Sequence, residues 1–361
     1  MKKNQILGFL ILLLVLNSSL FSLEKILHLR LSRLLEIGKD NLMFASIASI
    51  CEDDDSNFYV LDKKEHKVFK FSPEGKLILT FGRKGQGPGD FMQPNRISCS
   101  EKGQLVIANE LYDVSFLKRD GTFLRRVHLN GRIAPCYIGD GLFYSWIWMP
   151  EDKRQVIVDD DNTILKTFFK VARDSFSVTA PDSSGRLVMF NYAPDVYAPT
   201  LLFAHSKSHS VVAVSDRYEI HILNNTGKIM TTIQQDIQPD DIKKEEKKYF
   251  VKDIDEMGKN RNWPKSVTRK IIKNIPKKKN YFDRVLLSEK HIFVFRIRKD
   301  ISNELVSIPV DIFSLDGQYL GTASIDKKPL FISEKYMYFV QSDDQGNLYL
   351  LKMSYQIKRK T

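Results

Sequence analysis

The segment FGRKGQGPGDF (Phe81–Phe91) joins two stretches of the chain that share one pattern. The stretch before it is NFYVLDKKEHKVFKFSPEGKLILTF (Asn57–Phe81), and the stretch after it is GQLVIANELYDVSFLKRDGTFLRRV (Gly103–Val127). Each contains a strand-like apolar run, a short polar loop, a second strand, a tight turn at a glycine and a third strand. The glycine-rich segment is therefore the connection between two copies of a repeat.

The turn before the last strand of each unit occurs five times. It reads KFSPEGKLI, SFLKRDGTFL, IVDDDNTIL, IHILNNTGKIM and DIFSLDGQYL, with Gly75, Gly121, Asn162, Gly227 and Gly317 at the equivalent position. Glycine and asparagine tolerate the positive φ angle that a tight hairpin turn needs. The first two spacings, 46 and 41 residues, match one four-stranded propeller blade. The next two, 65 and 90 residues, are too long for a blade and indicate insertions.

The registration gives five full units and a shorter sixth. The full units span residues 44–81, 95–129, 133–169, 199–233 and 281–323. The sixth, from residue 329, supplies three strands, and ILHLRLSRLLEIG (26–38) can supply the fourth, which closes the ring and removes exposed sheet edges. The sequence therefore predicts an all-β fold for residues 23–361: a six-bladed β-propeller of four-stranded antiparallel blades, closed by the N-terminal strand, with a helical insertion.

The joint FGRKGQGPGDF, followed by a proline, a strand, LVIAN, a strand and KRDG, resembles the NHL-repeat and related TolB-like six-bladed β-propellers of bacterial envelopes. The resemblance is best over residues 57–129. The usual aspartate–arginine pair around the central turn is absent, and Asn109 and Asp113 in one unit, and Lys63 and Lys67 in another, stand in its place. The resemblance implies the fold and little about function, because propellers serve as enzymes and as binding platforms.

The first 22 residues have the pattern of a secretory signal peptide. Two lysines precede the apolar run Ile6–Leu16, and serines follow it. Eleven residues at 1.5 Å each are too few to cross a bilayer core of ~30 Å. An uncleaved anchor is the alternative. We expect an exported protein, periplasmic or extracellular.

Residues 236–280 change to helical periodicity and form the predicted insertion. Asp240 is a candidate cap of a first helix that ends at Gly258, and a second helix begins near Trp263 and ends at Pro276. The whole chain has a net charge of +11, and this insertion carries 14 basic and 8 acidic residues, a net +6. Its predicted basic patch consists of Lys259, Arg261, Lys265, Arg269, Lys270 and Lys273.

Such a patch attracts anions within a Debye length of ~8 Å. For an exported protein, the expected partners are an anionic envelope polymer, an acidic protein face or lipid head groups at a membrane surface, and nucleic acid is not expected. A basic surface that only faces solvent is the alternative. We predict that the insertion is a docking or lid element at one mouth of the propeller.

A second set of candidate ligand-binding residues lies in the loops between the second and third strands of the units. Equivalent loops of a propeller gather at one end, where converging polar and aromatic groups often bind ligands. Hydrogen bonding between blades is the alternative role. The residues are Lys63, His66, Asn109, Glu110, Tyr112, Arg217 and Tyr218.

Cys51, Cys99 and Cys136 fall at equivalent places, near the end of the first strand of three consecutive units. That strand lines the axis of a propeller, so we expect three small buried thiols. An odd number of cysteines cannot pair completely, which excludes a domain organised by disulfides.

No catalytic constellation is evident, and no cofactor or metal site is predicted. The histidines do not recur at equivalent blade positions, and neither a phosphate loop nor a nucleophile turn is present. Glu52–Asp55 supplies oxygens suited to calcium, but the spaced pattern of a calcium loop is missing, which favours a solvated turn.

The sequence thus favours a monomeric, exported binding or interaction module. The alternative is a cation-dependent hydrolase or lyase of the gluconolactonase kind, with its site in the central channel. Such an enzyme needs several inward carboxylates or amides, whereas the inferred axial strands are apolar and carry thiols.

Overall fold

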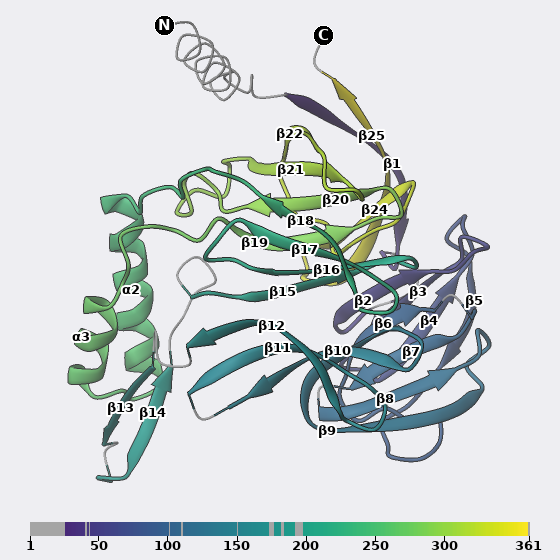
Figure 1. Cartoon of the computed structure of the whole chain (residues 1–361), viewed down its shortest axis with the longest axis horizontal. Coiled ribbons are helices and arrows are strands. Elements are labelled where there is room, and N and C mark those ends of the chain that lie inside the picture. Colours follow the sequence, from purple (N-terminus) through teal and green to yellow (C-terminus); the bar gives the residue numbers. More distant parts are fainter. Residues whose placement is uncertain are drawn as a thin grey trace, which may run out of the picture.

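The computed structural model describes residues 26–359, apart from 40, 41, 43, 101, 110, 150, 173–176, 182–183 and 192–197. Its strands form six antiparallel blades (Figure 1). The chain is a six-bladed β-propeller, as the repeat predicted. The predicted signal peptide lies outside the described residues. In the described part, no helix has the length and apolar character needed to cross a membrane.

The first three blades follow one another in sequence order. Blade 1 consists of β2 (Ile47–Glu52), β3 (Phe58–Asp62), β4 (Lys67–Phe71) and β5 (Leu77–Phe81). Blade 2 consists of β6 (Pro94–Cys99), β7 (Leu105–Asn109), β8 (Leu111–Leu117) and the first part of β9 (Phe123–Gly139). Blade 3 consists of the rest of β9, β10 (Leu142–Trp148), β11 (Asp152–Val158) and β12 (Ile164–Ala172).

The remaining blades complete the ring. Blade 4 consists of β15 (Leu201–His205), β16 (His209–Val214), β17 (Glu219–Asn224) and β18 (Ile229–Gln234). Blade 5 consists of β19 (Phe282–Leu287), β20 (His291–Arg296), β21 (Ile308–Ser314) and β22 (Tyr319–Ile325). Blade 6 consists of β23 (Phe331–Ile332), β24 (Tyr336–Ser342), β25 (Leu348–Arg359) and β1 (Leu27–Ile37).

The predicted closure by the N-terminal strand is confirmed. β1 pairs with β25 from Leu27↔Arg359 to Ile37↔Leu350, so the beginning and the end of the described chain share one blade. Leu27 is buried in a cluster with apolar side chains of blades 5 and 6. β1 is the outermost strand of this blade, so the N-terminal segment completes the last four-stranded sheet and closes the ring.

The recurring turn residues have the backbone conformation that the repeat required. Gly75, Gly121, Asn162, Gly227 and Gly317 all have positive φ angles, between +68° and +89°. At Gly121 a Cβ atom would lie 2.6 Å from Cγ of Phe81, on the outer strand of the preceding blade. Both the φ angle and the close approach of the next blade therefore require glycine here.

The boundary between blades 2 and 3 differs from the predicted units. The sequence separates residues 95–129 from 133–169, but β9 runs through this boundary as one strand. Its first part pairs with β8, as in Asp113↔His128, and its second part pairs with β10, as in Tyr144↔Cys136. Gly131, with a φ angle of +65°, lies at this boundary, where the pairing partner of β9 changes from β8 to β10.

The segment Phe81–Phe91 is a crossover linker. Phe91 is fully buried among side chains of blades 1 and 2, and Arg83 pairs with Asp90 at 2.8 Å. Arg126 of β9 donates to the carbonyl oxygens of Gln86, Gly87 and Asp90 at 2.9–3.0 Å. One arginine therefore satisfies three linker carbonyls, and the linker has an architectural role.

Two insertions stand between blades, as the long spacings required. Residues beyond β12 form a separate hairpin of β13 (Ser177–Pro181) and β14 (Leu187–Asn191). Between β18 and β19 lie α2 (Lys244–Asn260) and α3 (Lys265–Lys273), beside β13 (Figure 1). The helices pack through a core of their own.

The start of α2 differs from the prediction. Asp240 is not its cap, because the helix begins at Lys244 and the Glu246 side chain accepts from the backbone N–H of Lys243 at 2.8 Å. Glu246 also pairs with Lys279 at 2.7 Å, and both side chains are almost fully buried. This ion pair holds the beginning of α2 to the chain that leaves α3.

Candidate functional site: the central cavity

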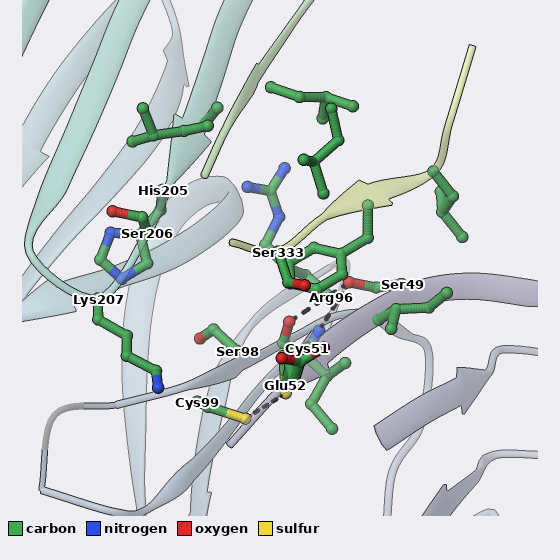
Figure 2. A pocket seen from close by; sticks show the side chains of 18 of the residues that line it. Ser49, Cys51, Glu52, Arg96, Ser98, Cys99, His205, Ser206, Lys207 and Ser333 are labelled. Carbon is green, nitrogen blue, oxygen red and sulfur yellow. Dashed lines mark hydrogen bonds between the residues drawn. The ribbon is translucent and has the colours of Figure 1, made fainter. Parts of the chain in front are cut away.

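A cavity of about 410 Å³ lies along the propeller axis and is bordered by the inner strand of every blade. The inner strands are β2, β6, the second part of β9, β15, β19 and β23. The turns that follow them also contribute, through residues such as Asp53, Lys207 and Glu289. The cavity thus gathers side chains from all six repeats, and Figure 2 shows part of this lining.

The three cysteines line the cavity, as the registration of the repeat predicted. Cys51 lies on β2, Cys99 on β6 and Cys136 on β9. Cys51 and Cys136 are buried, whereas Cys99 is partly exposed. Their Sγ atoms are not equally spaced, since those of Cys51 and Cys99 are only 2.6 Å apart.

Arg96 of β6 is the main cation within the cavity wall. Figure 2 shows its guanidinium group pointing into the cavity. Among the described residues, no carboxylate lies within ion-pair distance of Arg96, and its centre stands 5.7 Å from the ring of Phe203. The neighbouring His205 is neutral over the physiological range, because burial and then the charge of Arg96 lower its pKa to about 4. Arg96 is therefore a half-buried charge without a protein counter-ion.

The carboxylates of the cavity are already engaged. Asp53 accepts from the N–H groups of Asp55 and Asn57, which explains the acidic run as a turn. Asp54 pairs with Lys207 and, at 2.8 Å, with Arg119. These partners, Lys207 first, lower the pKa of Asp54.

Two further carboxylates are held by neutral donors. Glu289 accepts from the backbone N–H of Lys207 at 3.0 Å. Glu52 accepts from the hydroxyl of Tyr338 at 2.8 Å, and burial raises the pKa of Glu52. In the part of the chain that the structure describes, no three His, Cys, Asp or Glu side chains are grouped so that they could hold a metal ion.

The predicted ligand-binding loop residues lie elsewhere. Those that are described, Lys63, His66, Asn109, Tyr112, Arg217 and Tyr218, do not line the central cavity, and Glu110 is outside the described residues. They follow β3, β7 and β16, whereas the turns at the cavity precede these strands. The cavity therefore uses the opposite ends of the same strands.

The contacts of these loop residues run between neighbouring segments. Nδ1 of His66 lies 3.0 Å from the carbonyl oxygen of Phe91 in the linker. Tyr218 is buried and donates to Asp311 of blade 5 at 2.6 Å, and Arg217 stands 5.9 Å from the ring of Phe169 in blade 3. For Tyr218 and Arg217, contacts between blades are thus the observed role.

Asn109 and Tyr112 make their contacts within blade 2, and Lys63 contacts the segment before β2. The Asn109 side chain points to the carbonyl oxygen of Asp113 at 3.5 Å, and the Tyr112 ring stands 6.0 Å from that of His128. Lys63 donates its backbone N–H to Ser46 at 2.9 Å.

The predicted basic patch is brought together by the insertion. Lys259 lies in the last turn of α2, Arg261 lies between the helices, and Lys265, Arg269, Lys270 and Lys273 belong to α3. All six side chains are exposed, and none forms an ion pair with a described acidic residue. Lys279, also in this basic segment, is instead buried in its pair with Glu246.

Comparisons with known proteins agree with the fold. Residues 18–191 match the model of the family DUF5128, described as a 6-bladed beta-propeller. The first half of the chain is similar to this family. The match fits the resemblance to NHL-repeat propellers at the level of the fold. No match to a curated protein was found.

Two solved structures have the same architecture. One, from Bacteroides fragilis NCTC 9343, is described as a predicted exported protein; it is 14% identical, with a TM-score of 0.52, and the match covers 94% of this chain and 97% of that one. The other, a member of the duf4221 family from Bacteroides vulgatus, is 10% identical, with a TM-score of 0.55 and coverage of 92% and 99%. At these identities the similarity shows the fold alone.

Arg96 and the acidic lining of the cavity were not predicted from the sequence. The axial strands were expected to be apolar and thiol-bearing, but the cavity also includes Glu52, Asp53 and Glu289. The available signal was the registration itself: Arg96 stands three residues before Cys99, on a strand already placed at the axis.

Proposed function

We propose that this protein is an exported binding module that holds a carboxylate-bearing ligand in its central cavity, with Arg96 as the anchor. The observation that carries the proposal is the guanidinium group of Arg96, which points into the cavity without a carboxylate partner. Removing a charge from water is costly unless a counter-ion and hydrogen bonds replace the water. A ligand carboxylate can accept two parallel hydrogen bonds from a guanidinium group.

The rest of the lining supports a small ligand or one unit of a larger one. A volume of about 410 Å³ lies within the range of small-molecule sites. Phe203 offers an aromatic face beside Arg96, and Ser98 and Ser206 add hydroxyl groups. Acidic side chains at the turns do not compete for Arg96, because Asp54 already pairs with Lys207 and Arg119.

The ligand class we favour is an acidic envelope polymer that places one carboxylate-bearing unit in the cavity. Residues 1–22 have the signal-peptide pattern, and a structure of the same fold is described as a predicted exported protein. We therefore propose that cleavage leaves a mature propeller of residues 23–361, periplasmic or extracellular and monomeric. The basic patch of the insertion would attract the same polymer, or the polar surface of a membrane, through long-range charge.

One observation favours a second candidate, a cation-dependent hydrolase or lyase. Glu52, Asp53, Asp54, Glu289 and Glu334 all border the cavity. The enzyme ranks second because these carboxylates already have partners in the protein. Asp54 pairs with lysine and arginine side chains, Asp53 caps a turn, and Glu52 accepts from Tyr338. Metal analysis of the purified protein separates the two: one equivalent of calcium or zinc supports the enzyme.

The experiment is a thermal-shift series with matched acids and amides. Glucuronate, glucuronamide and glucose are each added to the mature chain, together with a uronate oligosaccharide and a poly-glutamate peptide as probes for polymer and protein. We expect the uronates to raise Tm and the amide and glucose to leave it unchanged. Equal shifts for acid and amide, or stabilisation by the peptide alone, would refute a carboxylate site for an envelope polymer.

A further inference from the structure

Cys51 and Cys99 form a thiol pair between two blades. Cys51 lies near the end of β2 and Cys99 ends β6, so the pair joins the inner strands of blades 1 and 2. Their Sγ atoms are 2.6 Å apart, well inside the contact distance of two unbonded sulfur atoms (Figure 2). The backbone therefore already brings the two sulfurs within reach of a covalent bond.

The strands that carry the pair are fixed relative to each other. The hydroxyl of Ser49, two residues before Cys51, accepts from the N–H of Ile97 at 3.2 Å and also lies 3.4 Å from the carbonyl oxygen of the same residue. Cys51 and the partly buried Cys99 belong to one apolar cluster with Tyr59 and Ile97. The contacts between the two strands therefore hold the two sulfurs close to each other.

The third cysteine has a different environment. Cys136 is buried on β9, where its thiol makes a weak contact to the carbonyl oxygen of Tyr137 at 3.8 Å and lies close to the Arg96 side chain. It has no sulfur partner among the described residues. The chain thus holds one close thiol pair and one isolated thiol.

We propose that Cys51 and Cys99 are a disulfide-forming pair that is oxidised after export, and that Cys136 remains a free thiol. That the protein reaches an oxidising compartment rests on the proposed export, whereas the pairing of Cys51 with Cys99 rests on their positions in the structure. Periplasmic and extracellular proteins meet oxidants that form disulfides, whereas cytosolic thiols stay reduced. The odd number of cysteines is then explained by one bond and one buried thiol.

The reaction is a thiol–disulfide exchange with a disulfide-bearing oxidant. Cys99 is the attacking group, because it is partly exposed, whereas Cys51 is fully buried and burial raises its pKa. The Cys99 thiolate attacks one sulfur of the oxidant, which forms a mixed disulfide and releases one oxidant thiol. Cys51 then attacks Cys99, forms the Cys51–Cys99 bond and releases the second oxidant thiol. The two protons of the cysteines end on these two thiols.

The bond would become part of the wall of the ligand cavity. Both cysteines border the cavity, and Arg96 lies on the same strand as Cys99. Asp53, which caps the next turn, follows Cys51 by two residues. A disulfide here closes a loop of about fifty residues. It would therefore reduce the conformational freedom of the segment between the two cysteines in the unfolded chain.

The test counts free thiols by mass spectrometry. The full chain is produced with its own N-terminal segment, and protein recovered from the periplasm is denatured in N-ethylmaleimide without reductant. We expect one label per chain, on Cys136, and three labels after reduction. A digest without reductant should contain the linked Cys51 and Cys99 peptides.

Matched variants identify the pair. Cys136→Ser should lose its single label and keep the linked peptides, whereas Cys51→Ser should show two labels and no linked peptide. A parallel sample, made in the cytoplasm and incubated with glutathione disulfide, separates pairing from export. Its oxidation to one label supports the pair even where export fails. Three labels after that incubation, or linkage through Cys136, would overturn the proposal.

Discussion

The central cavity and the helical insertion present positive charge in opposite ways. The insertion carries a net +6 in its sequence and exposes six unpaired basic side chains, from Lys259 to Lys273. The cavity wall contributes one unpaired guanidinium group, that of Arg96, enclosed by six inner strands. Solvent and salt screen exposed charges, while a charge in an enclosed site interacts more strongly with a bound ion. The half-buried Arg96 should therefore determine affinity, and the six exposed basic side chains of the insertion should assist the encounter.

The largest expected effect concerns how the insertion is attached. Lys279→Met removes the cation from a pair in which both side chains are almost fully buried. Breaking such a pair leaves an uncompensated charge on Glu246 and costs about 3–5 kcal/mol. We expect hydrogen exchange to become fast in α2 and α3 and to stay slow in the blades.

The control for the insertion is Lys270→Met, which removes an exposed basic side chain of α3. It should leave exchange in both regions unchanged. Equal loss of protection in the blades of the Lys279→Met protein would show that the insertion and the propeller unfold as one unit.

The next effect separates the two charged regions by affinity. Arg96→Met should weaken binding of a uronate probe by roughly 10- to 100-fold, since a charge-assisted hydrogen bond contributes about 1.5–3 kcal/mol. Arg269→Met makes the same change on exposed α3 and should weaken binding less than about threefold at physiological salt. Titration calorimetry measures both. Comparable losses in the two variants would remove the distinction between cavity and insertion.

A smaller effect tests the insertion as an attracting surface. Changing Lys265, Arg269 and Lys270 to glutamine should reduce retention on a uronate polymer column at low salt, with the difference lost well above physiological salt. The matched control changes Lys76, Lys118 and Lys228, which are exposed in the outer turns of blades 1, 2 and 4. If both triple variants elute together, the basic patch has no role beyond net charge.

The smallest expected effect is a pH dependence of stability that arises from His205 in the cavity wall. Burial first, and then Arg96, lower the pKa of His205 from 6.5 to about 4. Between these values the unfolded chain binds a proton that the folded chain does not, so acidification in this range destabilises the fold. His205→Gln should therefore lose less Tm than the parent between pH 7 and 5. The insertion has no histidine, so protection of α2 and α3 should not follow this difference.

The blades were predictable because their signals are local. Strand alternation and the positive-φ residues at Gly75 and its four equivalents repeat along the chain, and the N-terminal strand was identified by the strand missing from blade 6. The start of α2 was less predictable, because Glu246 is held by Lys279, which is 33 residues away. The hydrogen bond from Lys243 to Glu246 is local, but the ion pair with Lys279 leaves no pattern near the start of the helix.

The site was less predictable than the fold for the same reason. The sequence identified the axial strands by their cysteines, but Arg96 has the appearance of any polar residue in a strand until all six blades enclose it. It also directed attention to loops such as those of His66 and Tyr218, which follow the second strands, whereas the cavity is bordered by turns that precede them. The net charge of the insertion then favoured it as a binding surface, because its basic residues lie close together in the sequence.

The most direct test of the account is NMR of the arginine side chains during a titration with glucuronate. The mature chain is labelled with ¹⁵N-arginine, and the Nε–H signals of Arg96, Arg261 and Arg269 are assigned with single methionine variants. We expect the Arg96 signal to shift with ligand and the other two signals to stay in place at physiological salt. Shifts of Arg261 and Arg269 with an unchanged Arg96 would contradict this expectation and place the ligand on the insertion.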